Sequence, residues 1–297
     1  MTTNLRHKIA LFADSTCDIP EALVERYGIS ILPAYVIWGD EQYRDRIDLE
    51  PEAFYERLET DSVYPSSSHP TPEDFLNAFE HARSEGAEAV VVVTVSSAMS
   101  GTYNAAQQVA AGLDWPVHIV DSKGPTMSLG WQVLAAARAR EAAASDQAPE
   151  AVVTTMLDAA ERARRNMAQL VYMEAIKYLH KGGRIGHAVS LIGSVLHIRP
   201  VIYIDHETGL VEVERAARTR KQGIEAMVQG FYSRLELDRP LHVAVLHGNV
   251  PEDAERLAHR VQEEIHPKEL LINITGPVLG INTGPGALAL CGYSEEE

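Results

Sequence analysis

Hydroxyl-bearing side chains gather in four short loops of this 297-residue chain. A helix start offers free N–H groups and a partial positive charge, and serine or threonine hydroxyls add further donors, so such loops can hold a carboxylate or phosphate without a lysine. Helix capping explains any one loop equally well, but several together at the ends of strands favour a binding pocket. Three loops follow predicted strands and one precedes a predicted helix; they comprise residues 14–16, 96–102, 121–124 and 66–70.

Two further segments carry groups that can bind an anion or an apolar chain. In Lys181-Gly182-Gly183-Arg184 the guanidinium of Arg184 can pair an anion through two hydrogen bonds, although a glycine turn with a solvated arginine fits equally well. The apolar helix predicted at 185–196 suits an acyl chain through Ile192, Val195 and Leu196, while core packing explains it more simply. Residues 275–286 form a predicted glycine-rich loop that permits close backbone approach to a ligand.

Composition excludes several other classes of protein. The chain has 42 acidic and 26 basic residues and a formal charge of −16, which argues against non-specific nucleic-acid binding and adsorption to anionic lipid. Its two cysteines form no disulfide framework, no His/Asp/Glu cluster has metal spacing, and common nucleotide, hydrolase and zinc-protease motifs are missing. With no signal peptide and no bilayer-spanning run in the sequence, we expect a cytoplasmic protein without stable membrane insertion or metal.

Alternating strands and helices must position these loops. In the first half the predicted strands are 8–13, 31–37, 89–95 and 117–120, with Asp18, Asp48 and Thr71 as helix N-caps, which indicates a mostly parallel sheet covered by helices. The second half differs, with a strand at 169–173, an antiparallel hairpin of 199–204 and 210–216, and further helices and strands. We predict an α/β fold with one domain at 1–165, another at 166–297, and the ligand between them.

Taken in order, six motifs resemble those of the DegV family. Each is weak alone, but together they keep the family order and span nearly the whole chain. They are Asp14-Ser15-Thr16-Cys17-Asp18-Ile19-Pro20, Pro70-Thr71-Pro72-Glu73-Asp74-Phe75, Ser96-Ser97-Ala98-Met99-Ser100-Gly101-Thr102-Tyr103-Asn104-Ala105, Asp121-Ser122-Lys123, Tyr178-Leu179-His180-Lys181-Gly182-Gly183-Arg184-Ile185-Gly186 and Gly284-Pro285-Gly286-Ala287-Leu288.

This resemblance implies a two-domain DegV-like (EDD) fold with a long-chain fatty acid buried between the lobes. It implies a binding subunit that has no enzymatic activity by itself and has no nucleotide site or cofactor. The carboxylate would face outward toward a separate ATP-binding fatty acid kinase subunit of the DAK type. The acyl phosphate made there would stay on the carrier and feed phospholipid synthesis.

Carried over by motif, the carboxylate contacts are Ser67 with Ser68, Ser96 with Ser97, and Arg184, while Gly284 belongs to the last motif. Arg218 matches a basic segment that resembles the kinase-facing surface. Ser67 replaces the usual threonine of the family and keeps its hydroxyl, while two other departures change the chemistry. His69 stands where an amide is usual and can add positive charge at mildly acidic pH, whereas Asn282 replaces a histidine and cannot carry a proton.

Two alternatives remain open from the sequence. One is a serine-dependent acyl hydrolase that uses Ser97 or Ser100 with His247 or His69 as the base. The other is a regulatory protein whose lipid state changes how it binds a partner. Chemistry favours a long-chain acid as the ligand, because each buried CH₂ contributes about 0.8 kcal/mol and hydroxyl donors offset the cost of burying its carboxylate.

Overall fold

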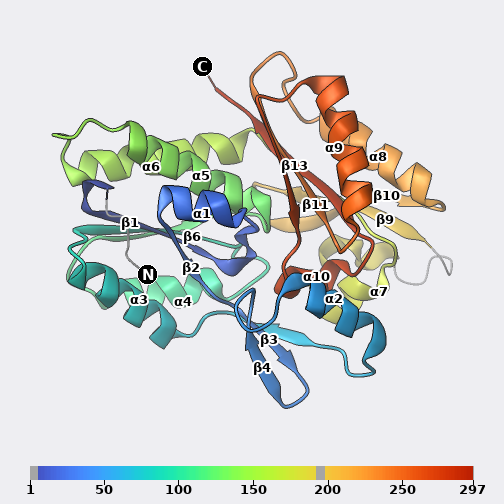
Figure 1. Ribbon diagram of the computed structural model, residues 1–297, viewed down its shortest axis with the longest axis horizontal. Coiled ribbons are helices and arrows are strands. Elements are labelled where there is room, and N and C mark those ends of the chain that lie inside the picture. Colours follow the sequence, from blue (N-terminus) through green and yellow to red (C-terminus); the bar gives the residue numbers. More distant parts are fainter. Residues whose placement is uncertain (1–5, 192–197, 297) are drawn as a thin grey trace.

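The computed structural model describes residues 6–191 and 198–296, whose two main sheets lie side by side in two lobes (Figure 1). In the first lobe four parallel strands run in the order β2-β1-β6-β7. The two central strands are buried along their whole length, as the apolar run at 89–95 predicts. Their bounds are β1 Ile9–Asp14, β2 Ile29–Leu32, β6 Ala89–Thr94 and β7 Val117–Asp121.

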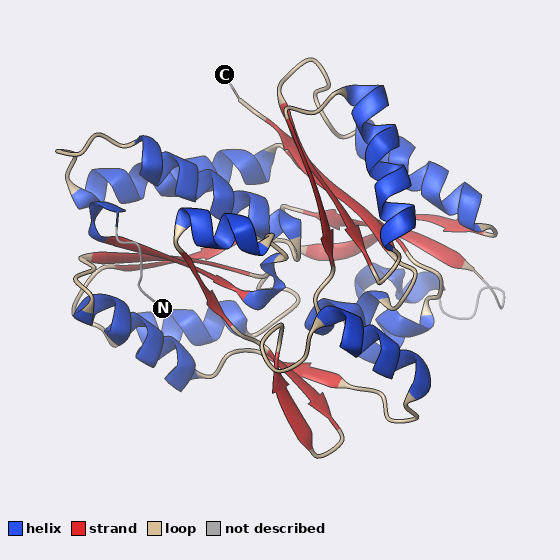
Figure 2. Cartoon of the chain, in the orientation of Figure 1, coloured by secondary structure: helices blue, strands red, loops and turns tan. Residues whose placement is uncertain are grey.

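Helices cover both faces of this sheet (Figure 2). Alternate residues of β6 point to opposite faces, so Val90 and Val92 pack with α3 and α4, while Val91 and Val93 pack with α5 and α6. The α3–α4 pair therefore closes one side and α1, α5 and α6 the other. Their bounds are α1 Glu21–Tyr27, α3 Pro72–Ser84, α4 Thr102–Ala110, α5 Met127–Ala142 and α6 Pro149–Arg165.

The second lobe holds a six-stranded mixed sheet in the order β10-β9-β8-β13-β11-β12. The antiparallel hairpin predicted from the sequence is confirmed as β9 and β10, and only β11 and β12 pair in parallel. Helices α8 and α9 cover the outer face (Figure 1). The bounds are β8 Met167–Tyr172, β9 Arg199–Asp205, β10 Leu210–Ala217, α8 Arg220–Tyr232, β11 Leu241–His247, α9 Pro251–Ile265, β12 Glu269–Ile274 and β13 Leu288–Ser294.

One apolar core joins the two lobes through α5 and α6. It contains side chains of the first sheet, both helices and the inner face of the second sheet. On α5, Arg140 donates to the carbonyl of Ile9 in β1 (2.9 Å), while Trp131 donates to the carbonyl of Cys291 in β13 (3.2 Å). Because α5 and α6 serve both sheets, the boundary between residues 165 and 166 stays a prediction.

A small third sheet forms an arm, residues 35–68, that reaches from the first lobe to the second. It has the strand order β4-β3-β5, and its core packs against α10 of the second lobe. The sequence prediction missed this: the strand predicted at 31–37 is broken after β2, and the predicted loop at 275–286 contains a helix. The bounds are β3 Tyr35–Trp38, β4 Glu41–Arg44, α2 Pro51–Thr60, β5 Ser66–Ser68, α7 Lys177–Gly182 and α10 Pro277–Thr283.

Of the three predicted helix caps, one is confirmed. Thr71 and Asp74 form a reciprocal capping box at the start of α3. Asp18 was predicted wrongly, because α1 has no side-chain cap and Asp18 is instead paired with Arg46 inside the protein. Asp48 was also predicted wrongly, since its carboxylate binds Arg44 and does not cap α2. In the described residues no helix is long and apolar enough to cross a bilayer.

Candidate functional site

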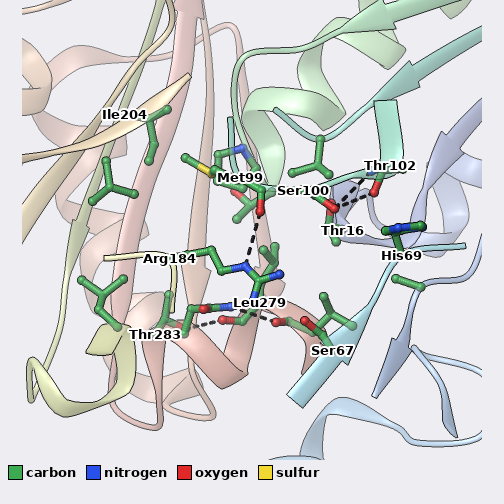
Figure 3. Close-up of a pocket in the computed structure, with 18 of the residues that line it drawn as sticks. Thr16, Ser67, His69, Met99, Ser100, Thr102, Arg184, Ile204, Leu279 and Thr283 are labelled. Carbon is green, nitrogen blue, oxygen red and sulfur yellow. Dashed lines mark hydrogen bonds between the residues drawn. The ribbon is translucent and has the colours of Figure 1, made fainter. Parts of the chain in front are cut away.

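A cavity of about 260 Å³ opens between the lobes, and residues of both lobes and the arm line it (Figure 3). This volume holds far more than one water, whose share of the liquid is about 30 Å³, and approaches the range of small-molecule pockets. The imidazole of His69 and most of the labelled hydroxyls lie on one side in Figure 3, Ile204 lies on the other, and Arg184 lies between them.

The first lobe and the arm supply what we call the hydroxyl wall: Thr16, Ser67, Ser100 and Thr102. Thr16 follows β1, Ser100 and Thr102 follow β6 at the start of α4, and Ser67 lies on β5. The hydroxyls of Ser100 and Thr102 lie 2.8 Å apart. Ser68 also lines the cavity, and its hydroxyl donates to the carbonyl of His69 (3.2 Å). The carboxyl ends of β1 and β6 therefore face the cavity, as the hydroxyl pattern predicts, whereas the loop 121–124 after β7, predicted to join them, does not line it.

His69 packs at the edge of the hydroxyl wall. Its Nδ1 lies 2.8 Å from the carbonyl oxygen of Pro70 and donates to it, which leaves Nε2 as an acceptor in the neutral ring. A Cβ added at Gly101 would lie 3.0 Å from ring atoms of His69, so the glycine lets the imidazole lie close to the start of α4. His69 is thus brought beside Ser67, Ser68 and the loop after β6.

The second lobe supplies what we call the strand wall: Gln169, Val171, Ile202, Ile204 and Val211. Residues two apart on a strand point to the same face, which places Gln169 with Val171 on β8 and Ile202 with Ile204 on β9. The register pairs Val171 with Ile202 and Ile204 with Val211. This wall is apolar apart from Gln169, and it suits a hydrocarbon chain.

Arg184, Asn282 and Gly182 meet at the mouth of the cavity. Arg184 is exposed, and its guanidinium donates to the carbonyls of Met99 (3.3 Å) and Gly182 (2.9 Å). Asn282 donates to the carbonyl of Val278 (3.2 Å), and its buried Oδ1 has no hydrogen-bond partner among the described residues. A Cβ at Gly182 would lie 2.1 Å from this oxygen, so Gly182 permits α7 and α10 to touch, whereas Gly183 makes the turn at φ 75°.

Three buried carboxylates hold the loops of the hydroxyl wall. Asp14 accepts from the backbone N–H groups of Thr16 (3.0 Å) and Val95 (2.7 Å). Asp45 accepts from the hydroxyl of Ser15 (2.6 Å) and the N–H of Val278 (3.3 Å), which links the first lobe to α10. Burial raises the pKa of Asp14, and it raises the pKa of Asp45 to about 7.

Asp18, the third carboxylate, is completely buried and forms an ion pair with Arg46 at 2.6 Å. It also accepts from the N–H of Gly276 (3.0 Å), while Arg46 donates to the carbonyl of Ile274 (2.6 Å). Burial raises the pKa of Asp18, and the Arg46 charge opposes that rise. The pair fastens the first lobe and the arm to the segment before α10, and no motif in the sequence pointed to Arg46.

Other predicted site residues lie away from the cavity lining. Ser96 is buried and donates to the carbonyl of Gly209 (2.9 Å), and Ser97 donates its hydroxyl to Asp121. The structure therefore does not bring the Ser96–Ser97 pair to the cavity with Ser67 and Ser68. Arg218 is exposed outside the cavity. The tail-lining candidates Ile192, Val195 and Leu196 lie outside the described residues; the part of their predicted helix that is described is a 3₁₀ helix, Gly186–Leu191.

Gly284 has a structural reason to be glycine. Its φ is 74°, and an added Cβ would lie 2.3 Å from the ring of Tyr178 on α7. It does not line the cavity, although its neighbour Thr283 does. Sequence reasoning did not single out Thr283, Thr126 or Gln169 of the lining. Gln169 is a single polar residue in an apolar strand, which gives no local signal.

The contacts of Ser97 and Ser100 do not resemble those of a hydrolase nucleophile. Ser97 is bonded to Asp121 and Ser100 to Thr102, whereas His247 accepts the N–H of Val250 (3.2 Å). Activation of a serine needs a base in hydrogen-bond contact with it. Across residues 6–191 and 198–296, no group of three or more His, Cys, Asp and Glu side chains is placed to hold a metal ion.

Comparison with known proteins identifies the family. Residues 8–295 match a family model described as an uncharacterised protein of the DegV family. The chain belongs to the DegV family. A DegV domain-containing protein of Clostridium acetobutylicum is 31% identical over 284 residues, which cover 95% of this chain and 98% of that protein.

Solved DegV structures share the fold over nearly the whole length. A DegV family protein from Thermus thermophilus, described by its fatty acid binding, is 29% identical and has a TM-score of 0.85, covering 97% of this chain and 99% of that chain. DegV from Bacillus subtilis, described as a fatty acid binding protein, is 26% identical with a TM-score of 0.84 and the same coverage. The two-lobe α/β fold expected from the resemblance is thereby confirmed.

Proposed function

We propose that this chain binds a long-chain fatty acid in the cavity between its lobes. The observation that carries the proposal is the division of one cavity into a hydroxyl wall and a mostly apolar strand wall. A fatty acid has the matching division between a carboxylate and a hydrocarbon chain. The Thermus thermophilus and Bacillus subtilis relatives, both described by fatty acid binding, support the same ligand.

The hydrocarbon chain supplies most of the binding free energy in this proposal. Each CH₂ moved from water to an apolar wall contributes about 0.8 kcal/mol, so Val171, Ile202 and Ile204 favour a long chain over a short one. The carboxylate contributes orientation, because a charged group in a dry site is costly unless it is hydrogen-bonded.

Ser67, Ser68 and the Ser100–Thr102 loop are the donors that we assign to the carboxylate. Arg184 adds a positive charge at the mouth of the cavity. We assign Ser96 and Ser97 a supporting role, because their hydroxyls hold the β9–β10 turn and Asp121 in this structure. Asn282 lies near enough to line the same cavity, but its amide neither carries charge nor transfers a proton.

We propose further that the protein presents the fatty acid to a separate ATP-dependent kinase subunit and is not an enzyme alone. Arg184 is exposed and lines the cavity, and Lys177 and Lys181 are exposed on the short helix α7 just before it in the chain. In a chain with a formal charge of −16, these basic side chains support a partner with an acidic or phosphate-bearing surface. Arg184 and Lys181 lie at the end of α7, and Lys177 at its start. Arg218 belongs to the same proposed surface.

Ser67→Ala tests the binding proposal. Loss of a hydrogen bond to a charged carboxylate should weaken oleate or palmitate binding about tenfold, as measured by calorimetry or native mass spectrometry. Ser66→Ala is the matched control, because Ser66 precedes Ser67 on β5 and does not line the cavity. A wild-type protein that binds no fatty acid would rule the proposal out.

The kinase step needs its own experiment. Phosphoryl transfer from ATP to bound oleate should require both this protein and a candidate kinase subunit. Lys181→Glu should reduce transfer and leave oleate affinity unchanged, whereas Lys268→Glu, which lies outside the cavity mouth, should change neither. Asn282→His should raise transfer if the amide limits it. Normal oleate binding without phosphoryl transfer by any kinase subunit would reject the carrier role and leave the fatty-acid binding proposal intact.

A further inference from the structure

Gln169 interrupts the apolar strand wall at a defined place. It lies on β8 two residues before Val171, and the register that pairs Leu170 with Tyr203 continues to place it beside Ile204. Figure 3 shows Ile204 across the cavity from Ser67, His69 and Thr102. The amide of Gln169 is therefore a polar group on the side where the proposed hydrocarbon chain lies, and it is 1% exposed.

A buried hydrogen-bond chain fixes this amide. The hydroxyl of Ser128 donates to Oε1 of Gln169 and lies 2.8 Å from Nε2 of His206. Since a hydroxyl has one hydrogen, Nε2 of His206 must then be the donor to Ser128. Burial lowers the pKa of His206 to about 4, so its ring is neutral at physiological pH and has one donor and one acceptor nitrogen. Nε2 of Gln169 makes a long bond to the hydroxyl of Thr126 (3.4 Å).

These hydrogen bonds leave one N–H of Gln169, a residue that lines the cavity, available to a ligand. Nε2 of Gln169 has two hydrogens, and within the described residues it bonds only to Thr126, which also lines the cavity. If the amide is turned by 180°, Nε2 donates to Ser128 and Oε1 faces Thr126 and the cavity instead. A ligand hydroxyl satisfies both arrangements because it donates and accepts, whereas a CH₂ satisfies neither.

We propose that the cavity prefers a fatty acid that carries a hydroxyl group on its hydrocarbon chain, hydrogen-bonded to Gln169 and Thr126. This proposal rests on the proposed fatty-acid site and names the substrate class within it. A plain hydrocarbon chain would leave the second N–H of the Gln169 amide without a hydrogen-bond partner. Sites built to bond a ligand hydroxyl discriminate strongly against analogues that lack it, for this reason.

A ligand panel with the wild-type protein tests the preference directly. Stearic acid is compared with hydroxystearic acids that carry the hydroxyl near the carboxyl end, in mid-chain or near the methyl end. We expect one hydroxy acid to bind about tenfold more tightly than stearic acid. If every hydroxy acid binds as tightly as stearic acid or more weakly, this inference is overturned and the fatty-acid proposal stands. If no acid binds at all, the fatty-acid proposal itself is overturned.

Gln169→Met then tests the assignment to this side chain, since methionine keeps the length and removes the amide. The hydroxy-acid preference should fall to parity, with stearic acid binding more tightly than before. Ile204→Val is the matched control: it removes one methylene from the neighbouring wall residue and should weaken both acids alike. A preference that survives Gln169→Met overturns the assignment. If that variant fails to fold, the wild-type panel still decides whether the preference exists.

Discussion

The two walls of the cavity are held in place by different means. The hydroxyl wall consists mainly of loops and a short strand of the arm. Asp14 and Asp45 bind a backbone N–H and a hydroxyl of these loops, and Asp18 ties the loop after β1 to Gly276. The strand wall consists of side chains on β8, β9 and β10, whose positions follow from sheet register alone. Loops have no ladder of backbone hydrogen bonds, so buried charges replace it on one side of the cavity.

This difference has an energetic cost on the loop side. A buried carboxylate stabilises the protein only while its partners satisfy it, since an unpaired buried charge is strongly unfavourable. The strand wall has neutral partners, including the Ser128–Gln169 pair. Changes in charge should therefore disturb the hydroxyl wall, and changes in shape or polarity should disturb the strand wall.

Arg46→Met gives the largest expected effect and tests whether charge holds the hydroxyl wall. It leaves Asp18 buried without its cation, so we expect the free energy of unfolding to fall by about 3–5 kcal/mol, measured by denaturant titration. Arg44→Met, two residues before Arg46, is the control, because Arg44 forms an exposed ion pair with Asp48. Equal unfolding midpoints for the two variants would refute the charge-dependent account.

Gly182→Ala tests the contact between α7 and α10 that closes the cavity mouth. The new Cβ would meet Oδ1 of Asn282, so we expect a loss of about 1–3 kcal/mol in unfolding free energy from overpacking. Adding Asn282→Ala should recover most of this loss in a double-mutant cycle. A loss that persists in the double mutant would show that the glycine is needed for another reason.

Asp45→Asn sharpens the comparison through pH and has the smallest expected effect. Burial raises the pKa of Asp45 from its ordinary value of 3.8 to about 7, so the folded protein holds a proton that the unfolded chain releases. This stabilisation is complete below about pH 4 and is lost as the pH rises through about 7. Between about pH 6 and about pH 8, the unfolding free energy of wild type minus that of Asp45→Asn should fall by on the order of 1 kcal/mol. A difference that is constant across this range would contradict it.

Sequence patterns predicted those parts that depend on local chemistry. The β-branched run at 89–95 predicted a central strand, Thr71 with Asp74 predicted a helix start, and the hydroxyls after β1 and β6 reach the cavity. These features depend on backbone propensity, periodicity and capping, all of which are determined by a few neighbouring residues.

The parts that the sequence did not predict depend on distant partners. Asp18 matches a capping residue by its neighbours, but Arg46 and Gly276 bind it in the folded chain. Gln169 looks like one polar residue in a strand until Ser128 and Thr126 orient its amide. The small helix α10 lies in a glycine-rich segment that has little intrinsic preference for a helix, and packing against the arm stabilises it.

The core shared through α5 and α6 has a consequence for how such proteins can evolve. Exchange of one lobe by recombination near residue 166 would pair a sheet with two helices shaped for another sheet, leaving mismatched apolar surfaces. We therefore expect the two lobes to be kept together, and the matches run over 95% or more of both this chain and the relatives compared above. Diversity can accumulate more freely in the arm and α10, which border the cavity and pack in a separate apolar cluster.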